Sequence, residues 1–380
     1  MPPETDRSAA VSGRARSRAD TKSDHELAGI EILRFICAFA VLIWHYQNLF
    51  FVGEWTPAIG AALRPTLPLY RYLRVFYDNG SLAVEFFWVI SGFIFYWHYA
   101  GPIRTRAVKF ADFLTRRFSR LYPLHFVTLI TVAVAQHVYY RSHQTNFIYV
   151  WDKPIWFASH LLFASNWFTR QPLTFNAPIW SVSIEMLIYL SFFVIARAFR
   201  PHILVAVCAA AAFASCFNFL HSFINPDVFA CGMYFFAGGV AQQLSARPGV
   251  FAIAGCALVG IPIVLTLGHY GLNAPFLLFL ATSSVIVFTR LGETACGVAF
   301  RHLAFLGNAT YSSYLLHFPL LLLTVMVVDA IGWKRSIFYS PISLLTYLCV
   351  VAGLSLVVYR YFEMPAQNLI RAVVRRHRAV

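Results

Sequence analysis

The chain has 380 residues, of which 59% are hydrophobic, 17% are aromatic and only 12% are charged, and its formal net charge is +14. A typical soluble domain carries about 25% charged residues, so this composition excludes a soluble globular protein and indicates an integral membrane protein. The positive charge is spread over short segments between apolar runs, which argues against a nucleic-acid partner and makes the lipid bilayer the expected one.

Residues 1–28 are polar and basic, and they lack the apolar core and small-residue cleavage site of a signal peptide. We therefore expect a disordered cytoplasmic tail there. From residue 29 onward, apolar windows of about 20 residues, the length that crosses a bilayer, recur almost to the C-terminus. This pattern predicts one membrane domain over residues 29–367, followed by a short basic cytoplasmic tail over residues 368–380.

Ten apolar segments have the length and composition of transmembrane helices. They lie at residues 29–51, 82–100, 121–139, 178–198, 202–221, 228–245, 249–267, 274–290, 304–328 and 338–360. A shorter aromatic segment at residues 156–168 is expected to form an interfacial or re-entrant helix. With the N-terminus in the cytoplasm, most of the 30 Lys and Arg residues fall on the cytoplasmic side, as the positive-inside rule requires. The predicted fold class is an all-α integral membrane protein, a bundle of about ten transmembrane helices with both termini cytoplasmic.

The first predicted helix carries Arg34 and His45, which are eleven residues apart. This spacing is close to three helical turns, or roughly 16 Å of rise, so the two side chains share one face. An ionisable residue inside the membrane costs roughly 2.5–3.5 kcal/mol on insertion scales, and by default it faces the bundle interior and serves a function. The alternative is that Arg34 pairs with Glu31 at the cytoplasmic interface and that His45 bonds to a backbone carbonyl.

The segment FLTRRFSRLYPLHF, between the second and third predicted helices, carries Arg117 and Arg120. Residues three apart lie on the same side of a helix, so the two arginines face the same way if the segment is helical. Arginine binds phosphate through two parallel hydrogen bonds and stays charged. The pair predicts a docking site for a phosphate-rich cytosolic ligand, with ordinary positive-inside charges as the alternative.

Six segments in chain order resemble the acyltransferase 3 family of membrane O-acyltransferases, which modify bacterial surface glycans. They are Arg34 and His45 in the first helix, VEFFWVISGF at 84–93, RRFSRLYPL at 116–124, NAPIWSVSIE at 176–185, GNATYSSYLLHFPL at 307–320 and YFEMPAQ at 361–367. The resemblance implies a multi-pass protein of the bacterial inner membrane. It implies transfer of an acyl group, usually acetyl, from cytosolic acyl-coenzyme A to a hydroxyl of an extracytoplasmic carbohydrate. No permanently bound cofactor is expected.

The resemblance and the spacing together predict a site. The phosphates of the acyl-coenzyme A donor are expected to rest on Arg117 and Arg120, while its flexible arm passes Arg34. A sugar hydroxyl needs a base to become a nucleophile, and histidine has the pKa closest to working pH, so His45 is the predicted base. Either Glu185 or Glu85 is expected to orient the imidazole. No metal site is expected, because the cysteines are scattered singly without metal-ligand spacing.

Other interpretations stay open at this point. His317 either packs against the helix backbone freed by Pro319 or takes part in the site, and Glu363 is expected to pair with a cytoplasmic arginine. A polytopic transporter of a small polar or anionic solute is an alternative function, although no internal repeat supports it. A further alternative is an O-acyltransferase for a lipid or a protein, with His317 as the catalytic histidine.

Overall fold

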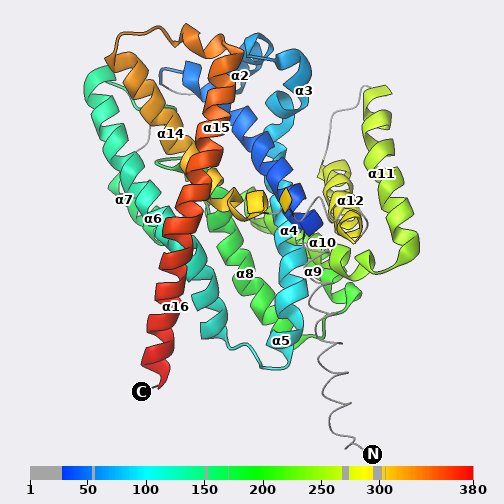
Figure 1. Ribbon diagram of the computed structural model, residues 1–380. Coiled ribbons are helices and arrows are strands. Elements are labelled where there is room, and N and C mark those ends of the chain that lie inside the picture. Colours follow the sequence, from blue (N-terminus) through cyan, green and yellow to red (C-terminus); the bar gives the residue numbers. More distant parts are fainter. Residues whose placement is uncertain are drawn as a thin grey trace, which may run out of the picture.

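The computed structural model describes residues 28–53, 56–149, 153–169, 171–267, 274–293, 302–303 and 305–379. The predicted disordered tail therefore lies outside the described residues, apart from Ala28. The described chain is helical nearly throughout (Figure 1). It contains no β-strand within these ranges, only an isolated antiparallel bridge between Phe168 and Ile224.

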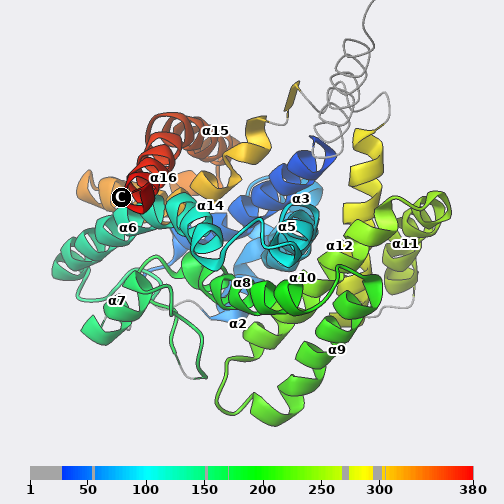
Figure 2. The ribbon, with the colours of Figure 1, turned by 90° about the horizontal axis from the view of Figure 1, so that it is seen from below.

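The first helix covers residues 28–45 and continues as a 3₁₀ turn, Tyr46–Phe50. The other helices are α2 (Pro57–Leu63), α3 (Tyr70–Asn79), α4 (Ala83–Phe95), α5 (Gly101–Arg104), α6 (Phe110–His143), α7 (Pro154–Leu161), α8 (Trp180–Ala198), α9 (Ile203–Leu220), α10 (Pro226–Ser245), α11 (Pro248–Leu267), α12 (Ala274–Gly292), α14 (Thr310–Ala330), α15 (Pro341–Val358) and α16 (Met364–Ala379). In the view from below, α16 lies beside α6, and α11 lies at the opposite edge of the molecule (Figure 2).

Within the described ranges, eight helical segments are long and apolar enough to cross a membrane. They are Ala28–Phe50, Tyr70–Arg104, Phe110–His143, Ala177–Ala198, Ile203–Leu220, Ala274–Gly292, Thr310–Ala330 and Pro341–Arg376. The two other predicted spans form α10 and α11, and α11 contains a shorter apolar helix, Gly249–Pro262. The prediction of an all-helical membrane protein is confirmed, while the cytoplasmic position of both termini stays a prediction.

Helix α6 is much longer than its predicted span of residues 121–139. It begins at Phe110 and runs without interruption through Pro123 to His143. The polar RRFSR segment, expected in a loop, is therefore the first part of a helix. Hydropathy marks only the apolar part of such a helix, which explains the missed boundary.

Close backbone contact holds α4 against α10. A side chain at Gly92 would begin 1.7 Å from the carbonyl oxygen of Phe235, so only glycine fits there. Gly238 on α10 approaches Val89 on α4 in the same way. This packing fixes the orientation of α4 and turns its opposite face toward the first helix, α6 and α8.

Two of the long helices contain a π-helical turn. Tyr96–Ala100 joins α4 to α5, and Tyr359–Glu363 joins α15 to α16. Such turns are rare and occur frequently at functional sites. The basic segment from residue 368 onward, expected as a tail, is thereby part of a helix that continues α15 and packs against α6.

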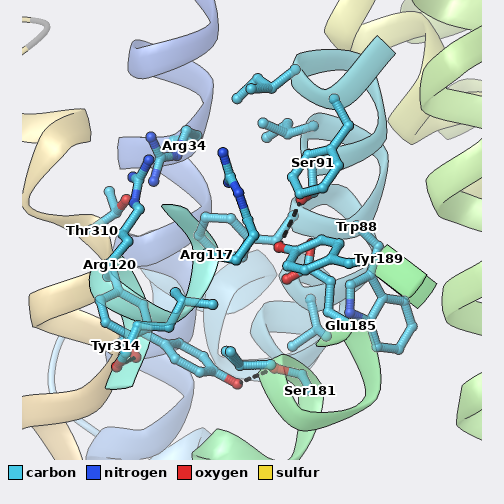
Figure 3. A pocket seen from close by; sticks show the side chains of 18 residues that line it. Arg34, Trp88, Ser91, Arg117, Arg120, Ser181, Glu185, Tyr189, Thr310 and Tyr314 are labelled. Carbon is cyan, nitrogen blue, oxygen red and sulfur yellow. Dashed lines mark hydrogen bonds between the residues drawn. The ribbon is translucent and has the colours of Figure 1, made fainter. Parts of the chain in front are cut away.

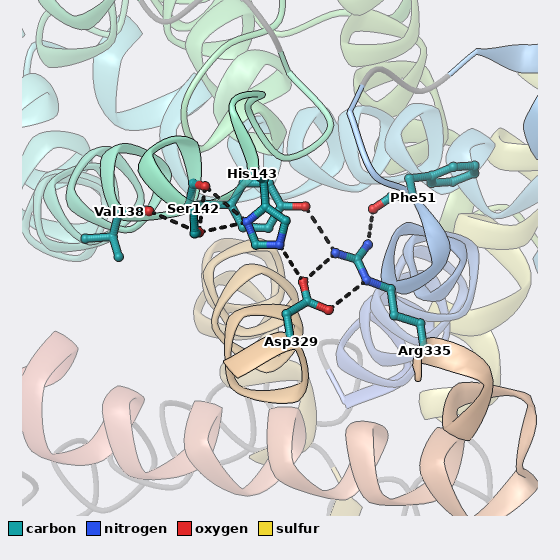
Figure 4. A network of polar contacts seen from close by, with 7 residues as sticks. Phe51, Val138, Ser142, His143, Asp329 and Arg335 are labelled. Carbon is teal, nitrogen blue, oxygen red and sulfur yellow. Dashed lines mark hydrogen bonds and ion pairs between the residues drawn. The ribbon is translucent and has the colours of Figure 1, made fainter. Parts of the chain in front are cut away.

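A polar network joins the far ends of α6 and α14 (Figure 4). Asp329 accepts hydrogen bonds from Arg335 Nε and Nη2, at 3.2 and 2.7 Å, and lies 3.0 Å from His143 Nε2. Arg335 also donates to the hydroxyl of Tyr139 and to the carbonyl of Phe51. Burial disfavours the charged guanidinium, but the hydrogen bonds to Asp329 and Tyr139 outweigh it and raise the pKa of Arg335. The network ties the first helix to α6 and α14.

Candidate active site

A cavity of about 130 Å³ lies among the first helix, α4, α6, α8 and α14 (Figure 3). Its polar lining residues are Arg34, Ser91, Arg117, Arg120, Ser181, Glu185, Tyr189, Thr310, Tyr311 and Tyr314. The other lining residues are apolar, among them Phe87, Trp88 and Phe95. We call this space the inner cavity. Figure 3 shows the three guanidinium groups gathered on one side of it and Glu185 with Trp88 on the other.

A second cavity of about 490 Å³ adjoins the inner cavity. The two share four lining residues, Arg34, Ile94, Arg117 and Arg120, so the three arginines predicted to contact the donor lie at their junction. The second cavity is also lined by Glu31, His98, Tyr99, Pro102, Val108, Arg116, Gln367 and Arg371. Five arginines and a single carboxylate line this cavity, and we call it the basic chamber.

Arg117 is held in place by two aromatic rings. Its Nη2 donates a hydrogen bond of 2.5 Å to the hydroxyl of Tyr99, and its guanidinium carbon lies 4.6 Å from the ring centre of Phe95. It also lies 4.9 Å from the ring centre of Tyr99 itself. These cation–π contacts position the charge without neutralising it. The Nε of Arg117 is buried and has no hydrogen-bond partner among the described residues.

The guanidinium group of Arg120 has neither a hydrogen bond nor an ion pair within the part of the chain that the structure describes. The positive charges of Arg34 and Arg117 act on it, and the nearby carboxylates of Glu363 and Glu31 offset them in part. Concentrating like charges at the wall of a low-dielectric cavity favours an anionic ligand. Arg117 and Arg120 line the same two cavities, as expected for residues three apart on one helix.

Arg34 forms an ion pair with Glu31, through contacts of 2.9 and 3.0 Å from Nη1 to the two carboxylate oxygens. The Glu31–Arg34 pairing, given above as the alternative to a functional role, is thus present. Arg34 nevertheless lines both cavities as well. Gly307, at the start of the GNATYSSYLLHFPL motif, lets the chain before α14 approach this pair. A side chain there would begin 2.3 Å from Glu31 Oε2 and 2.5 Å from its carbonyl oxygen.

The structure separates the two candidate carboxylates. Glu185 lines the inner cavity, and its Oε1 is buried without a hydrogen-bond partner in the described chain. The hydroxyls of Ser91 and Tyr189, which are hydrogen-bonded to each other at 3.3 Å, line the same cavity (Figure 3). Glu85 does not line either cavity; it is partly buried on α4, and the negative charge of Asp227 on α10 acts on it. The two segments that carry these glutamates therefore do not bring both carboxylates into one cavity.

Ser181, one turn before Glu185, is also part of the inner cavity. Its hydroxyl lies 2.8 Å from that of Tyr314, which in turn donates a 2.6 Å hydrogen bond to the carbonyl of Pro178. The Tyr314 hydroxyl proton is thus used, so Ser181 is the donor to Tyr314. These bonds attach α8 to α14 at the base of the cavity.

His45 does not line the inner cavity. Its Nδ1 lies 3.0 Å from the carbonyl of Val41, an acceptor, so Nδ1 carries a proton and Nε2 is the nitrogen able to accept one. Its ring centre is 4.5 Å from that of His317, which is fully buried. The His317 ring is 5.8 Å from that of Tyr314, a cavity residue. His45 thus connects to the cavity through two rings of α14.

Two residues at the C-terminal end differ from expectation. Glu363 does not pair with an arginine within the described ranges; its carboxylate accepts a 2.6 Å hydrogen bond from Ser312 instead. Glu363 is buried, and Ser312 of α14 supplies the hydrogen bond that its carboxylate needs there. Sequence reasoning also missed Arg371, which lines the basic chamber from α16. The signal available was the amphipathic pattern of residues 364–379, of which residues 368 onward were interpreted as a tail because they are not apolar.

Comparison with known proteins identifies the family of the chain. Residues 27–360 match the family model of acyltransferase 3, described as an acyltransferase domain. One curated relative, Acyltransferase MdmB of Streptomyces mycarofaciens, is 28% identical over 319 residues, which are 75% of this chain and 76% of the relative. No solved structure matches significantly. The family resemblance found in the sequence is confirmed: the chain belongs to the acyltransferase 3 family.

Proposed function

We propose that the protein is an O-acyltransferase of the bacterial inner membrane. In this proposal it moves an acyl group, typically acetyl, from cytosolic acyl-coenzyme A to a hydroxyl of an extracytoplasmic glycan. The observation that carries the proposal is the position of Arg34, Arg117 and Arg120 at the junction between a basic chamber and a largely apolar cavity. A donor with an anionic head and a long neutral arm fits such a pair of spaces.

The chemistry of coenzyme A accounts for both spaces. Its nucleotide end carries phosphates, for which arginine is the preferred planar partner. The basic chamber supplies several arginines with little neutralising charge. Its pantetheine arm is long and uncharged, and the inner cavity offers apolar walls with a few hydroxyl groups. The acyl arm would then pass Glu185 in the inner cavity, and its thioester would lie beyond Tyr314, toward His317 and His45.

The proposed reaction transfers the acyl carbonyl from sulfur to oxygen. His45 Nε2 accepts the proton of the acceptor hydroxyl while that oxygen attacks the thioester carbonyl. The carbon–sulfur bond then breaks, and the coenzyme A thiolate leaves and takes up a proton. Glu185 is the proposed carboxylate of the cavity, where it assists proton movement or orients the acceptor. The acceptor would approach from the side of His45 and His317.

The test compares transfer with transport. The full-length protein is reconstituted into liposomes and supplied with acetyl-coenzyme A carrying a radiolabelled acetyl group, together with surface polysaccharide from a strain lacking the gene. We expect labelled acetyl ester on the polysaccharide. Movement of label across the membrane without any ester would support the transporter alternative instead. NMR of the polysaccharide from the deletion strain should show that acyl ester signals have vanished, and the gene encoding the unaltered chain should restore them.

A further inference from the structure

A third cavity, of about 320 Å³, continues the basic chamber between α6 and α16. It is lined by Asp112, Thr115, Arg116, Arg371, Val374 and Arg375. Arg116 and Arg371 also line the basic chamber, so the two spaces adjoin. We call this third space the outer pocket. Along α6 the three spaces follow one another: the inner cavity reaches Leu121, the basic chamber covers Arg116 to Arg120, and the outer pocket reaches Asp112.

Helix α16 supplies the arginines of the outer pocket from one face. Arg371 and Arg375 are four residues apart and therefore lie on the same side of the helix. Arg371 Nε donates a 3.2 Å hydrogen bond to the hydroxyl of Ser119 on α6, which attaches α16 beside the basic chamber. Arg375 Nε donates to the backbone carbonyl of Arg371, at 3.3 Å. Both guanidinium groups keep donors free for a ligand, since each has five N–H groups.

Positive charge exceeds negative charge in the outer pocket, since three arginines and one carboxylate, Asp112, line it. None of Arg116, Arg371 and Arg375 forms an ion pair with a described carboxylate, and the charges of Arg116, Arg117 and Arg375 all act on Arg371. Like charges held together on two packed helices repel each other and favour a bound anion. The sequence explains Arg371 and Arg375 as topogenic charges, but topology alone does not require a pocket between them.

We propose that Arg371 and Arg375 bind the 3′-phosphate of the coenzyme A donor. This inference rests on the proposed function. Coenzyme A presents, in order, its thioester, its pantetheine arm, its diphosphate and the 3′-phosphate of its ribose. The inner cavity, the basic chamber and the outer pocket follow in the same order along α6. The diphosphate then lies on Arg117 and Arg120, and the outermost phosphate reaches α16.

The test compares two donors, acetyl-coenzyme A and 3′-dephospho-acetyl-coenzyme A, with the full-length reconstituted protein. The unaltered protein should show a KM about tenfold higher or more for the dephospho donor, because charge-assisted hydrogen bonds to phosphate are lost. Arg371→Gln and Arg375→Gln should raise the KM for acetyl-coenzyme A by a similar factor. Neither should change the KM for the dephospho donor much, and kcat should stay near its original value.

Two control variants separate binding from folding. Arg376→Gln removes the same charge from an exposed neighbouring position that lines none of the three spaces, and should leave the donor preference intact. Ser119→Ala removes the hydrogen bond that attaches Arg371 to α6, but keeps its charge, and should also preserve the preference. Equal KM increases for both donors in Arg371→Gln and Arg375→Gln would overturn the inference.

Calorimetric titration with coenzyme A and with 3′-dephospho-coenzyme A distinguishes this inference from the proposed function. Tighter binding of coenzyme A, dependent on Arg371 and Arg375, supports the phosphate assignment even if no transfer is observed. That combination would overturn the proposed function alone. Transfer with equal binding of the two compounds would overturn the phosphate assignment and leave the proposed function standing.

Discussion

The imidazole rings of His45 and His317 lie 4.5 Å apart, one on the first helix and one on α14. His45 is partly accessible, whereas His317 is fully buried. The carbonyl of Val41 fixes the proton of His45 on Nδ1, so its Nε2 is left to act as a base. In the proposed reaction, His45 is therefore the member that transfers the proton, and His317 supports it by packing.

Replacing His45 by Gln should remove the base. We expect kcat to fall by about 10²–10⁴-fold, the usual contribution of general acid–base catalysis, with little change in the KM for acetyl-coenzyme A. His317→Phe keeps a ring of similar shape against His45 and should cost far less activity. Acetyl transfer is measured after immunoblots have shown equal amounts of each variant in the membrane. Loss of activity in His317→Phe alone would reverse the assignment and favour the lipid or protein acyltransferase alternative.

Glu185 and Glu85 should respond differently to the same substitution. Glu185→Gln removes the carboxylate that lines the inner cavity, so kcat should drop by about 10²-fold or more. Glu85→Gln changes a side chain outside both cavities and should leave kcat close to that of the unaltered protein. Both variants are compared in the acetyl-transfer assay across a range of pH. A larger loss in Glu85→Gln would contradict the placement of the active site in the inner cavity.

Arg117 is the most constrained of the junction arginines, and its loss should act on donor binding. Arg117→Gln should raise the KM for acetyl-coenzyme A by about tenfold or more, since hydrogen bonds to charged groups are worth roughly 1.5–3 kcal/mol. Arg117→Lys should recover only part of the affinity, because an ammonium lacks the planar fork and the stacking on Phe95. The exposed Arg200 offers a matched control: Arg200→Gln should leave the KM unchanged.

Gly307 should tolerate no side chain. Gly307→Ala places a methyl group against the backbone of Glu31, so the first helix must shift and carry the Glu31–Arg34 pair with it. Overpacking of this kind costs about 1–3 kcal/mol of stability, and we also expect weaker donor binding. Gly353→Ala on α15, where nothing lies within 4 Å of the new methyl, is the control. Thermal unfolding in detergent measures both variants, and equal melting temperatures would contradict the close approach.

The network around Asp329 should contribute to stability rather than to catalysis. Asp329→Asn removes the charge shared by Arg335 and His143 and should lower the free energy of unfolding by about 1–3 kcal/mol. The Arg74–Asp78 pair is more exposed, so Asp78→Asn should cost less than about 1 kcal/mol. Thermal unfolding ranks the two variants, and KM for acetyl-coenzyme A should be normal in both. A raised KM in Asp329→Asn would link the network to the donor site.

Hydropathy was sufficient for the membrane core of the fold. The predicted span 178–198 and the observed segment Ala177–Ala198 nearly coincide, because the helix is apolar over its whole length and hydropathy therefore marks both of its ends. The same criterion failed at the polar ends. Residues 110–120 of α6 and 364–379 of α16 are helical but charged, so the arginines that they carry were assigned to a loop and a tail.

The positions of the site residues were likewise predictable only in part. The spacing of Arg117 and Arg120 placed both on one face, since helical geometry alone decides that relationship. The choice between Glu85 and Glu185 needed the positions of other helices: the close α4–α10 contact at Gly92 determines which face of α4 meets the cavity. The contribution of Arg371 depends likewise on the packing of α16 against α6: the amphipathic pattern indicates a helix there, but it does not say which helix it packs against.

The π-helical turn Tyr359–Glu363 sets the rotational phase of the last helix. A π-helical turn accommodates one residue more than an α-helical turn, and one residue corresponds to about 100° of rotation. If the turn were regular α-helix, Arg371 would swing away from Arg116, and Ser119 would lose its partner. Converting this turn to regular α-helix without deleting a residue would therefore keep every arginine of α16 in the chain while rotating the whole row away from the path proposed for the donor.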